Sequence, residues 1–146
     1  MEKTITIPDK PIAKGKLSGF FVGGLIPDGY GVKGFEAHDT AIATRKRQEE
    51  AFEAGIAPAC GDEVFKLMTE SGPHPEYTHG YVTKQAEPLD VPHSWRGWKD
   101  RDLKRFIGLY PELYAKSKAI HQKATTDFRW ANLGTIDGKV VFLDWS

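Results

Sequence analysis

Two polar residues near the carboxyl end of the sequence have side chains that suit a metal ion. Asn132 offers an amide oxygen, and Asp144 offers a carboxylate at the end of an apolar stretch. Both are hard oxygen ligands, and Mg²⁺ in proteins takes one or two carboxylates and completes its octahedron with phosphate oxygens and water. Asn132 and Asp144 are therefore candidate ligands for Mg²⁺, provided that the chain brings them together.

The sequence between these two residues predicts a β-hairpin. An Asp-Gly pair at 137–138 tolerates the positive φ angles of a two-residue type I′ turn. Strands are predicted at 133–136 and 139–143, the second rich in β-branched and aromatic residues. Asn132 and Asp144 are then one step out of register, so they converge only if the chain leaves the ladder there. The pairs expected across the turn are Ile136 with Lys139, Leu133 with Phe142, Asn132 with Leu143 and Ala131 with Asp144.

This carboxyl-terminal pattern resembles the catalytic loop and metal-binding Asp of the protein-kinase-like superfamily, which includes the aminoglycoside phosphotransferases. Asp127 precedes Asn132 by five positions, a short hairpin follows, and Asp144 ends its second strand. The resemblance implies that Asp127 orients or deprotonates the attacking hydroxyl, and that Asn132 and Asp144 hold Mg²⁺ on the phosphates of ATP. The same three residues also suit a turn cap, an Asx turn and a solvated carboxylate.

The composition suits a single domain over residues 1–146 and excludes some partners. With 20 basic and 20 acidic residues, the chain has no net field to attract nucleic acid or an anionic membrane. Near-neutral charge disfavours solubility, which permits a homo-oligomer. The single cysteine, Cys60, excludes an internal disulfide, and we interpret it as a packing residue. No signal peptide or bilayer-spanning apolar run is apparent, so we expect a soluble cytoplasmic protein.

Alternating segments in the first 35 residues predict a three-stranded antiparallel meander. The segments are 4–7, 16–22 and 30–35, separated by turn signals that contain Pro and Gly. This meander resembles the opening strands of a kinase amino-terminal lobe and implies that Lys33 contacts the α- and β-phosphates. No G-x-G-x-x-G motif lies between the first two strands. A solvent-facing strand lysine is an equally good interpretation of Lys33.

A helix is predicted from Asp39 or Thr40 to a stop at Gly55. Helical spacing places Glu49 on the side of Ile42 and Phe52, facing the sheet. The kinase resemblance needs a Glu here to hold the strand Lys, so Glu49 is the candidate and Glu50 the second choice. A solvated helix whose charges form only i,i+4 pairs is the alternative.

Two further strands, 63–68 and 80–85, complete a predicted five-stranded antiparallel sheet in a lobe of residues 1–87. In its loops, His74 and His79 are too isolated to indicate a metal site, because no acidic or thiolate partner is apparent, so we expect both to be solvated.

Residues 88–146 then predict a minimal second lobe. Aromatic and aliphatic side chains recur with helical period from Ser94, and a second helix runs from Leu113 to Gln122. The predicted fold is therefore α+β and kinase-like, with two lobes. No counterpart of the family's region beyond the metal-binding Asp is present. The resemblance implies an ATP- and Mg²⁺-dependent phosphotransferase. The missing region implies that its hydroxyl acceptor is small or presented by a partner. A non-catalytic, kinase-derived module that binds or inhibits a partner protein, and an unrelated α+β domain, are the alternatives.

Overall fold

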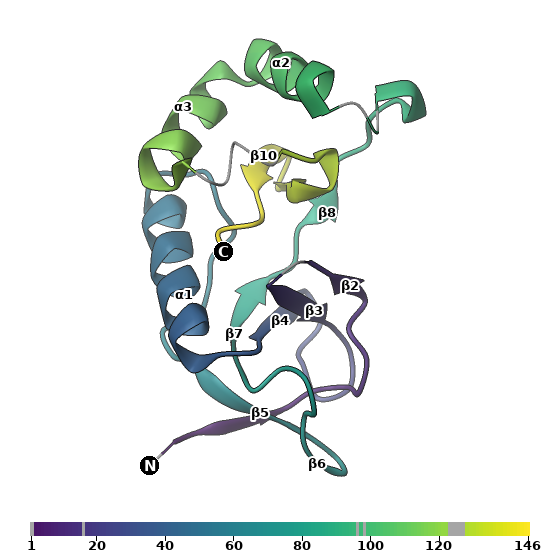
Figure 1. Ribbon diagram of the computed structural model, residues 1–146, viewed down its shortest axis with the longest axis vertical. Coiled ribbons are helices and arrows are strands. Elements are labelled where there is room, and N and C mark those ends of the chain that lie inside the picture. Colours follow the sequence, from purple (N-terminus) through teal and green to yellow (C-terminus); the bar gives the residue numbers. More distant parts are fainter. Residues whose placement is uncertain (1, 16, 96, 98, 123–127) are drawn as a thin grey trace. The chain divides into compact units, whose positions relative to one another are not determined.

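A computed structural model describes residues 2–15, 17–95, 97, 99–122 and 128–146 (Figure 1). The chain divides into two compact units. Unit 1 contains Met1–Lys46, Ala59–Gln85 and Ser146, and unit 2 contains Arg47–Pro58 and Ala86–Trp145. The helix α1 (His38–Glu53) contributes to both units. The secondary structure is mixed α+β, as the sequence predicts.

Unit 1 is built on a seven-stranded mixed sheet, in the order β1-β5-β7-β4-β3-β2 with β6 paired to β5. All neighbouring strands are antiparallel except β1 and β5, which are parallel. The strands are β1 (Thr4–Thr6), β2 (Ala13–Lys14), β3 (Ser18–Phe21), β4 (Tyr30–Phe35), β5 (Phe65–Thr69), β6 (Gly72–Pro73) and β7 (His79–Lys84).

The prediction of a five-stranded antiparallel sheet is wrong, because residues 4–7 do not begin the meander. They form the parallel edge strand β1, which lies beside β5 (Figure 1). The short strand β2 takes the predicted place beside β3. Two prolines, Pro8 and Pro11, lack the N–H that a continuous ladder needs, so β1 and β2 cannot form one strand. Ile7 then anchors β1, because its side chain is buried and its N–H donates to the Met68 carbonyl at 2.7 Å.

The buried side chains of unit 1 form two clusters. Burial alternates along β3, whereas β4 has buried residues on both faces, with Val32 on one face and Phe35 on the other. The first cluster consists of Ile7, Phe21, Ile26, Val32, Leu67 and Tyr77, and the second of Phe35, Ala41 and Tyr81.

The end of α1 confirms the helix stop predicted at Gly55. Gly55 has φ +79°, and its N–H donates to the Phe52 carbonyl. The N–H of Ile56 donates to the Ala51 carbonyl at 2.9 Å. These two hydrogen bonds form a Schellman motif with glycine at C′, where the left-handed conformation carries no Cβ penalty.

Unit 2 combines two helices with a three-stranded sheet in the order β10-β9-β8. Its elements are β8 (Glu87–Pro88), the 3₁₀ turn η1 (His93–Trp95), α2 (Lys99–Leu109), α3 (Pro111–Ile120), the 3₁₀ turn η2 (Trp130–Asn132), β9 (Leu133–Ile136) and β10 (Lys139–Phe142). Pro111 opens α3 at a position where its missing N–H costs no hydrogen bond. The buried core is largely aromatic, and Phe106 stacks on Phe128 with ring centroids 4.4 Å apart and planes 8° apart.

The carboxyl-terminal hairpin has the predicted turn and register. Asp137 and Gly138 have φ of 52° and 79°, as a type I′ turn requires. Lys139 pairs with Ile136, and Phe142 pairs with Leu133. Strand β8 adds a third strand on the other side of β9, which the sequence did not predict.

The described helices can also be compared with the thickness of a lipid bilayer. Within the described residues, no helix combines the length and apolar character that a membrane crossing requires.

Candidate functional site

The two predicted metal ligands lie at the open end of the carboxyl-terminal hairpin, one step out of register as the sequence predicts. The last ladder pair is Leu133 with Phe142. Beyond it, the N–H of Leu143 donates to the Asn132 carbonyl at 2.7 Å. Asn132 belongs to the 3₁₀ turn η2 rather than to β9, and β10 has already ended at Phe142. The hydrogen bond between Leu143 and Asn132 therefore continues the pairing one position beyond β10, and Asp144 is the next residue along the chain.

Asp144 lies between two buried aromatic anchors. Phe142 and Trp145 are both fully buried, with ring centroids 5.7 Å apart. The Trp145 Nε1–H donates to the Phe142 carbonyl at 2.9 Å, and Arg47 Nε donates to the Trp145 carbonyl at 2.7 Å. The N–H of Phe142 also donates to the Ile56 carbonyl at 2.8 Å. The backbone on both sides of the half-buried Asp144 is thus fixed, which is what a positioned ligand needs.

Asp127, the predicted catalytic residue, lies outside the described residues. The residues that follow it are firmly packed: Phe128 and Trp130 are buried, and their rings meet edge to face at 5.0 Å. The short helix η2 begins at Trp130 and ends at Asn132. The stretch between the predicted catalytic and metal-binding residues is therefore anchored through its two aromatic side chains.

Lys33, the predicted phosphate contact, lies in unit 1 on the interior strand β4. It pairs with Phe20 of β3 on one side and with Tyr81 of β7 on the other. Its side chain is half-buried, whereas its neighbours Val32 and Gly34 on the opposite face are buried. A lysine with hydrogen-bonded strands on both sides has a well-defined backbone position.

Glu49 is half-buried in unit 2, but the prediction that it shares a packed helix face with Ile42 and Phe52 is wrong. Ile42 and Phe52, which were expected to share its packed face, are 43% and 48% exposed. The buried stripe of α1 instead consists of Ala41, Thr44, Gln48 and Ala51. Two members of this stripe are polar, and Gln48 Nε2 donates to the Pro58 carbonyl at 3.0 Å. A packed helix face that contains polar residues hydrogen-bonded to the backbone cannot be recognised from the spacing of hydrophobic residues alone.

Glu50, the second choice, is exposed. Of the two acidic residues, Glu49 is therefore the one with partly desolvated surroundings.

The connection between β2 and β3 is too short for an extended phosphate-covering loop. It comprises residues 15–17 only, and the Gly15 N–H donates to the Ser18 carbonyl at 2.8 Å. This agrees with the absence of a G-x-G-x-x-G motif in the sequence.

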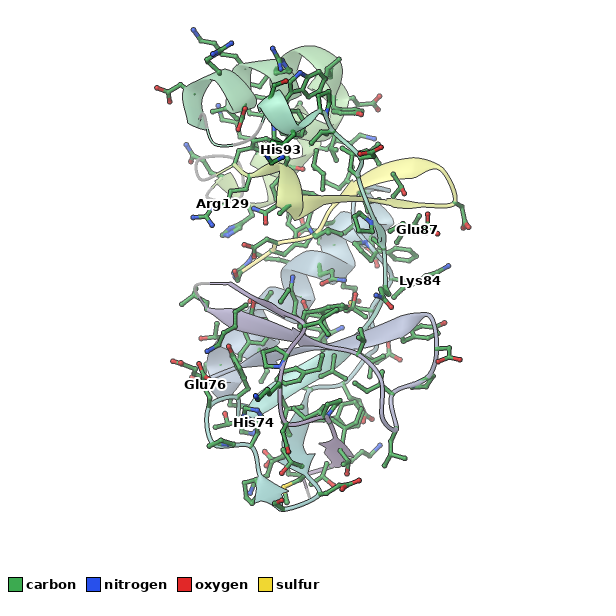
Figure 2. The ribbon with its side chains drawn as sticks, turned by 90° about the vertical axis from the view of Figure 1, so that its right-hand side faces the viewer. His74, Glu76, Lys84, Glu87, His93 and Arg129 are labelled. Atoms are coloured by element: carbon green, nitrogen blue, oxygen red, sulfur yellow. The ribbon has the colours of Figure 1, made fainter. Side chains whose placement is uncertain are left out.

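His74 is a buried structural residue, so the expectation that it is solvated is wrong (Figure 2). Its Nδ1 accepts hydrogen bonds from the backbone N–H groups of Glu76 and Tyr77 at 3.1 and 3.0 Å. Its Nε2 must then carry the proton and donate to the Asp9 carbonyl, 2.9 Å away. The ring also packs edge-on against Phe21. Both ring nitrogens are therefore occupied by the fold.

His79 is also incorrectly predicted, because it belongs to a group of ligand-type side chains that sequence reasoning missed. Among the described residues, one atom each from Glu2, His38 and His79 lies within 4.8 Å of the other two. The three residues come from separate parts of the sequence, so no local spacing motif could have revealed them. They are brought together by the pairing of β1 with β5 and of β7 with both β5 and β4.

Comparison with known proteins adds no assignment for any of these residues. No protein-family model and no curated protein matches this sequence.

Proposed function

We propose that this chain is a kinase-like phosphotransferase of reduced size that uses ATP and Mg²⁺. The observation that supports the proposal is the open end of the hairpin, where Asn132 pairs with Leu143 and Asp144 follows on a fixed backbone. An amide and a carboxylate oxygen form a donor set that suits Mg²⁺, which keeps its remaining positions for phosphate and water. Bound Mg²⁺ would neutralise negative charge on the transferred phosphoryl group.

The order of elements along the chain supports the same proposal. A three-stranded meander of β2, β3 and β4 bears Lys33 on its last strand, a helix bearing Glu49 follows, and the sheet strands β5 and β7, with the short β6 between them, come next. This is the succession that the kinase resemblance implies, even though the first strand of the meander is not the predicted one. Lys33 and Glu49 would position the phosphates.

Asp127 would orient the acceptor hydroxyl and receive its proton, while Asn132 and Asp144 would hold the Mg²⁺ that binds the phosphates of ATP. The acceptor is a small hydroxyl compound or a hydroxyl presented by a partner. Catalysis of this kind depends on positioning and charge neutralisation rather than on covalent chemistry by the protein.

The hairpin itself provides a matched test of the metal ligands. Asp144→Asn and Asp137→Asn make the same chemical change at its two ends, and Asp137 is an exposed turn residue at which Asn also tolerates positive φ. We expect ATP binding that requires Mg²⁺ in the wild-type chain and in Asp137→Asn. In Asp144→Asn we expect that dependence to be lost, as measured by titration calorimetry with and without Mg²⁺. Equal binding in both variants would contradict the proposal.

Asp127→Asn and Lys33→Met test the remaining roles. Asp127→Asn should bind MgATP normally but transfer no phosphate to water or to a small alcohol, as measured with γ-labelled ATP. Lys33→Met should weaken ATP binding itself. Turnover that survives Asp127→Asn would remove the catalytic role from that residue.

The short connection between β2 and β3 favours a second candidate function, a kinase-derived module that binds a partner protein without turnover. A three-residue connection covers little of a nucleotide. This function predicts that MgATP binds but that wild-type turnover is no higher than that of Asp127→Asn. The same two measurements therefore distinguish the candidates.

A further inference from the structure

Three segments of unit 1 meet around one polar cluster. Glu2 lies just before β1, His38 is the first residue of α1, and His79 is the first residue of β7. The sheet brings them together. Lys66 of β5 pairs with Thr4 of β1 and with His79 of β7, and Phe35, at the end of the strand that precedes α1, also pairs with His79.

Hydrogen bonding fixes the tautomer of His79. The Thr78 hydroxyl donates its single proton to the Glu36 carbonyl at 2.9 Å. In its 2.9 Å contact with His79 Nδ1, the Thr78 oxygen must therefore accept, so His79 Nδ1 carries a proton. In the neutral imidazole, the lone pair then lies on Nε2.

That lone pair faces a carboxylate. His79 Nε2 lies 3.1 Å from Glu2 Oε2, so two acceptors oppose each other unless a proton or a metal ion lies between them. A proton would satisfy only the two facing acceptors of Glu2 and His79. The nearby third side chain favours a metal ion, because the rings of His38 and His79 meet edge to face with centroids 4.7 Å apart.

We propose that Glu2, His38 and His79 form a site for a divalent transition-metal ion, with Zn²⁺ the best fit. Two imidazoles and one carboxylate are a ligand set that Zn²⁺ accepts, and a water molecule completes the tetrahedron. Tetrahedral bonds of about 2.0–2.1 Å place neighbouring ligand atoms about 3.3–3.4 Å apart. The Glu2–His79 distance of 3.1 Å is close to this value. The full spread of 4.8 Å requires a small rotation of His38, whose side chain is 46% exposed.

Both histidines have an outer partner of the kind that orients metal ligands. Thr78 holds Nδ1 of His79, and the Asp39 carboxylate lies 3.5 Å from Nδ1 of His38. Such partners fix the ring and strengthen the other nitrogen as a ligand. We therefore assign Nε2 of each histidine to the metal.

The bound metal would fasten three segments that are distant in sequence. Because a folded site of this kind does not exist in the unfolded chain, its binding free energy adds to the stability of unit 1. This site is separate from the proposed phosphotransfer residues. Mg²⁺, which prefers oxygen ligands, should not compete for it.

The test is a Zn²⁺ titration of a chain that carries no histidine tag and has been stripped with a chelator. We expect one equivalent to bind and to raise the thermal midpoint. Glu2→Gln and His38→Ala remove half-exposed side chains, so they should leave the circular dichroism spectrum unchanged. Each should weaken Zn²⁺ binding by more than the about 10–100-fold that loss of an outer partner causes.

His93→Ala is the matched control, because His93 is an exposed histidine of η1 outside the cluster. It should bind Zn²⁺ like the wild-type chain, as should Asp144→Asn. The proposal is overturned if no stoichiometric binding occurs, or if Glu2→Gln and His38→Ala bind as tightly as His93→Ala.

Ring ¹⁵N spectra of the histidines give a second readout that does not depend on affinity. On addition of Zn²⁺, His79 should show a metal-bound Nε2 and a protonated Nδ1, and Thr78→Val should weaken binding by about 10–100-fold. Spectra in which both nitrogens of His79 stay protonated would show a simple ion pair with Glu2 and would overturn the proposal.

Discussion

The two units of this protein have cores of different kinds. In unit 2, aromatic volume fills the interior: the ring of Phe106 has four aromatic neighbours with centroids between 4.4 and 6.3 Å away. In unit 1, the strands at the centre of the sheet can approach each other only where a residue has no side chain. A Cβ on Gly80 would collide with the Lys33 carbonyl oxygen of the adjacent strand. The core of unit 2 therefore depends above all on its aromatic side chains, whereas the centre of the unit 1 sheet also depends on Gly80, where no side chain fits.

The largest effect should come from removing aromatic volume in unit 2. Phe106→Ala should lower the free energy of unfolding by about 3–5 kcal/mol, because it leaves a cavity beside Phe128. Leu109→Ala on the same helix should change it by less than about 0.5 kcal/mol, since Leu109 is 51% exposed. Urea titrations with an unchanged m-value would measure both. Equal effects of the two substitutions would show that the aromatic cluster does not carry the core.

The next largest change in the free energy of unfolding should come from adding side-chain volume to unit 1. Gly80→Ala forces β4 and β7 apart at the Lys33 carbonyl and should cost about 1–3 kcal/mol. Gly108→Ala, in a helix of unit 2 with open space around the new methyl group, should instead stabilise by about 0.5–1 kcal/mol. Urea unfolding should show opposite signs for the change in the free energy of unfolding in the two variants. If Gly80→Ala also stabilises, the contrast between the units is wrong.

A glycine can also be required for its backbone angle rather than for space. Gly55 has φ +79°, and the nearest atom to an added Cβ is the mobile end of Lys139. Gly55→Ala should therefore cost about 1–2 kcal/mol through backbone strain. Gly55→Asn should cost less, although Asn is larger, because it tolerates the left-handed region. Thermal denaturation of the two variants tests this order. The reverse order would assign the cost to crowding.

The smallest effect should be a loss of stability of unit 1 in alkali. Burial raises the pKa of Tyr77 above its ordinary 10.0, and a hydrogen bond from Lys14 to Glu76 raises the pKa of Lys14 above 10.5. A raised pKa in the fold gives stability that is present below the ordinary value and is lost as pH rises through the folded value. The free energy of unfolding should therefore fall above about pH 10.

Tyr77→Phe keeps the ring and removes the ionising hydroxyl. The urea midpoint of this variant should fall less steeply than that of the wild-type chain between about pH 9 and about pH 11. Glu76→Gln should lower the pKa of Lys14, as measured by NMR of its side chain, because the hydrogen-bonded charge is gone. An identical alkaline loss in Tyr77→Phe would exclude Tyr77 as its source.

Sequence alone predicted the parts of the structure that are determined locally. The Asp137-Gly138 turn sets the register of its own hairpin, and with it the pairing of Asn132 with Leu143. The helix stop at Gly55 is equally local. Each depends on residues a few positions apart, whose backbone preferences act directly on one another.

The parts that were missed depend on distant pairing or on satisfied polar groups. The alternating segment at 4–7 has a strand pattern that fits either edge of the sheet, and only its parallel partner β5 decides between them. The packed face of α1 was missed because Thr44 and Gln48 lie in it. The cluster around His79 follows from the β1 pairing and was therefore missed with it.

The parallel pairing of β1 with β5 also affects how the chain folds during its synthesis. Thr4 pairs with Lys66, so at about 5–20 residues per second the ribosome takes on the order of several seconds to supply the partner strand. During that interval, the β1 segment has an unpaired edge and an isoleucine side chain that will later be buried. The nascent chain therefore carries an apolar segment with an unpaired strand edge until β5, which ends at Thr69, has been synthesised.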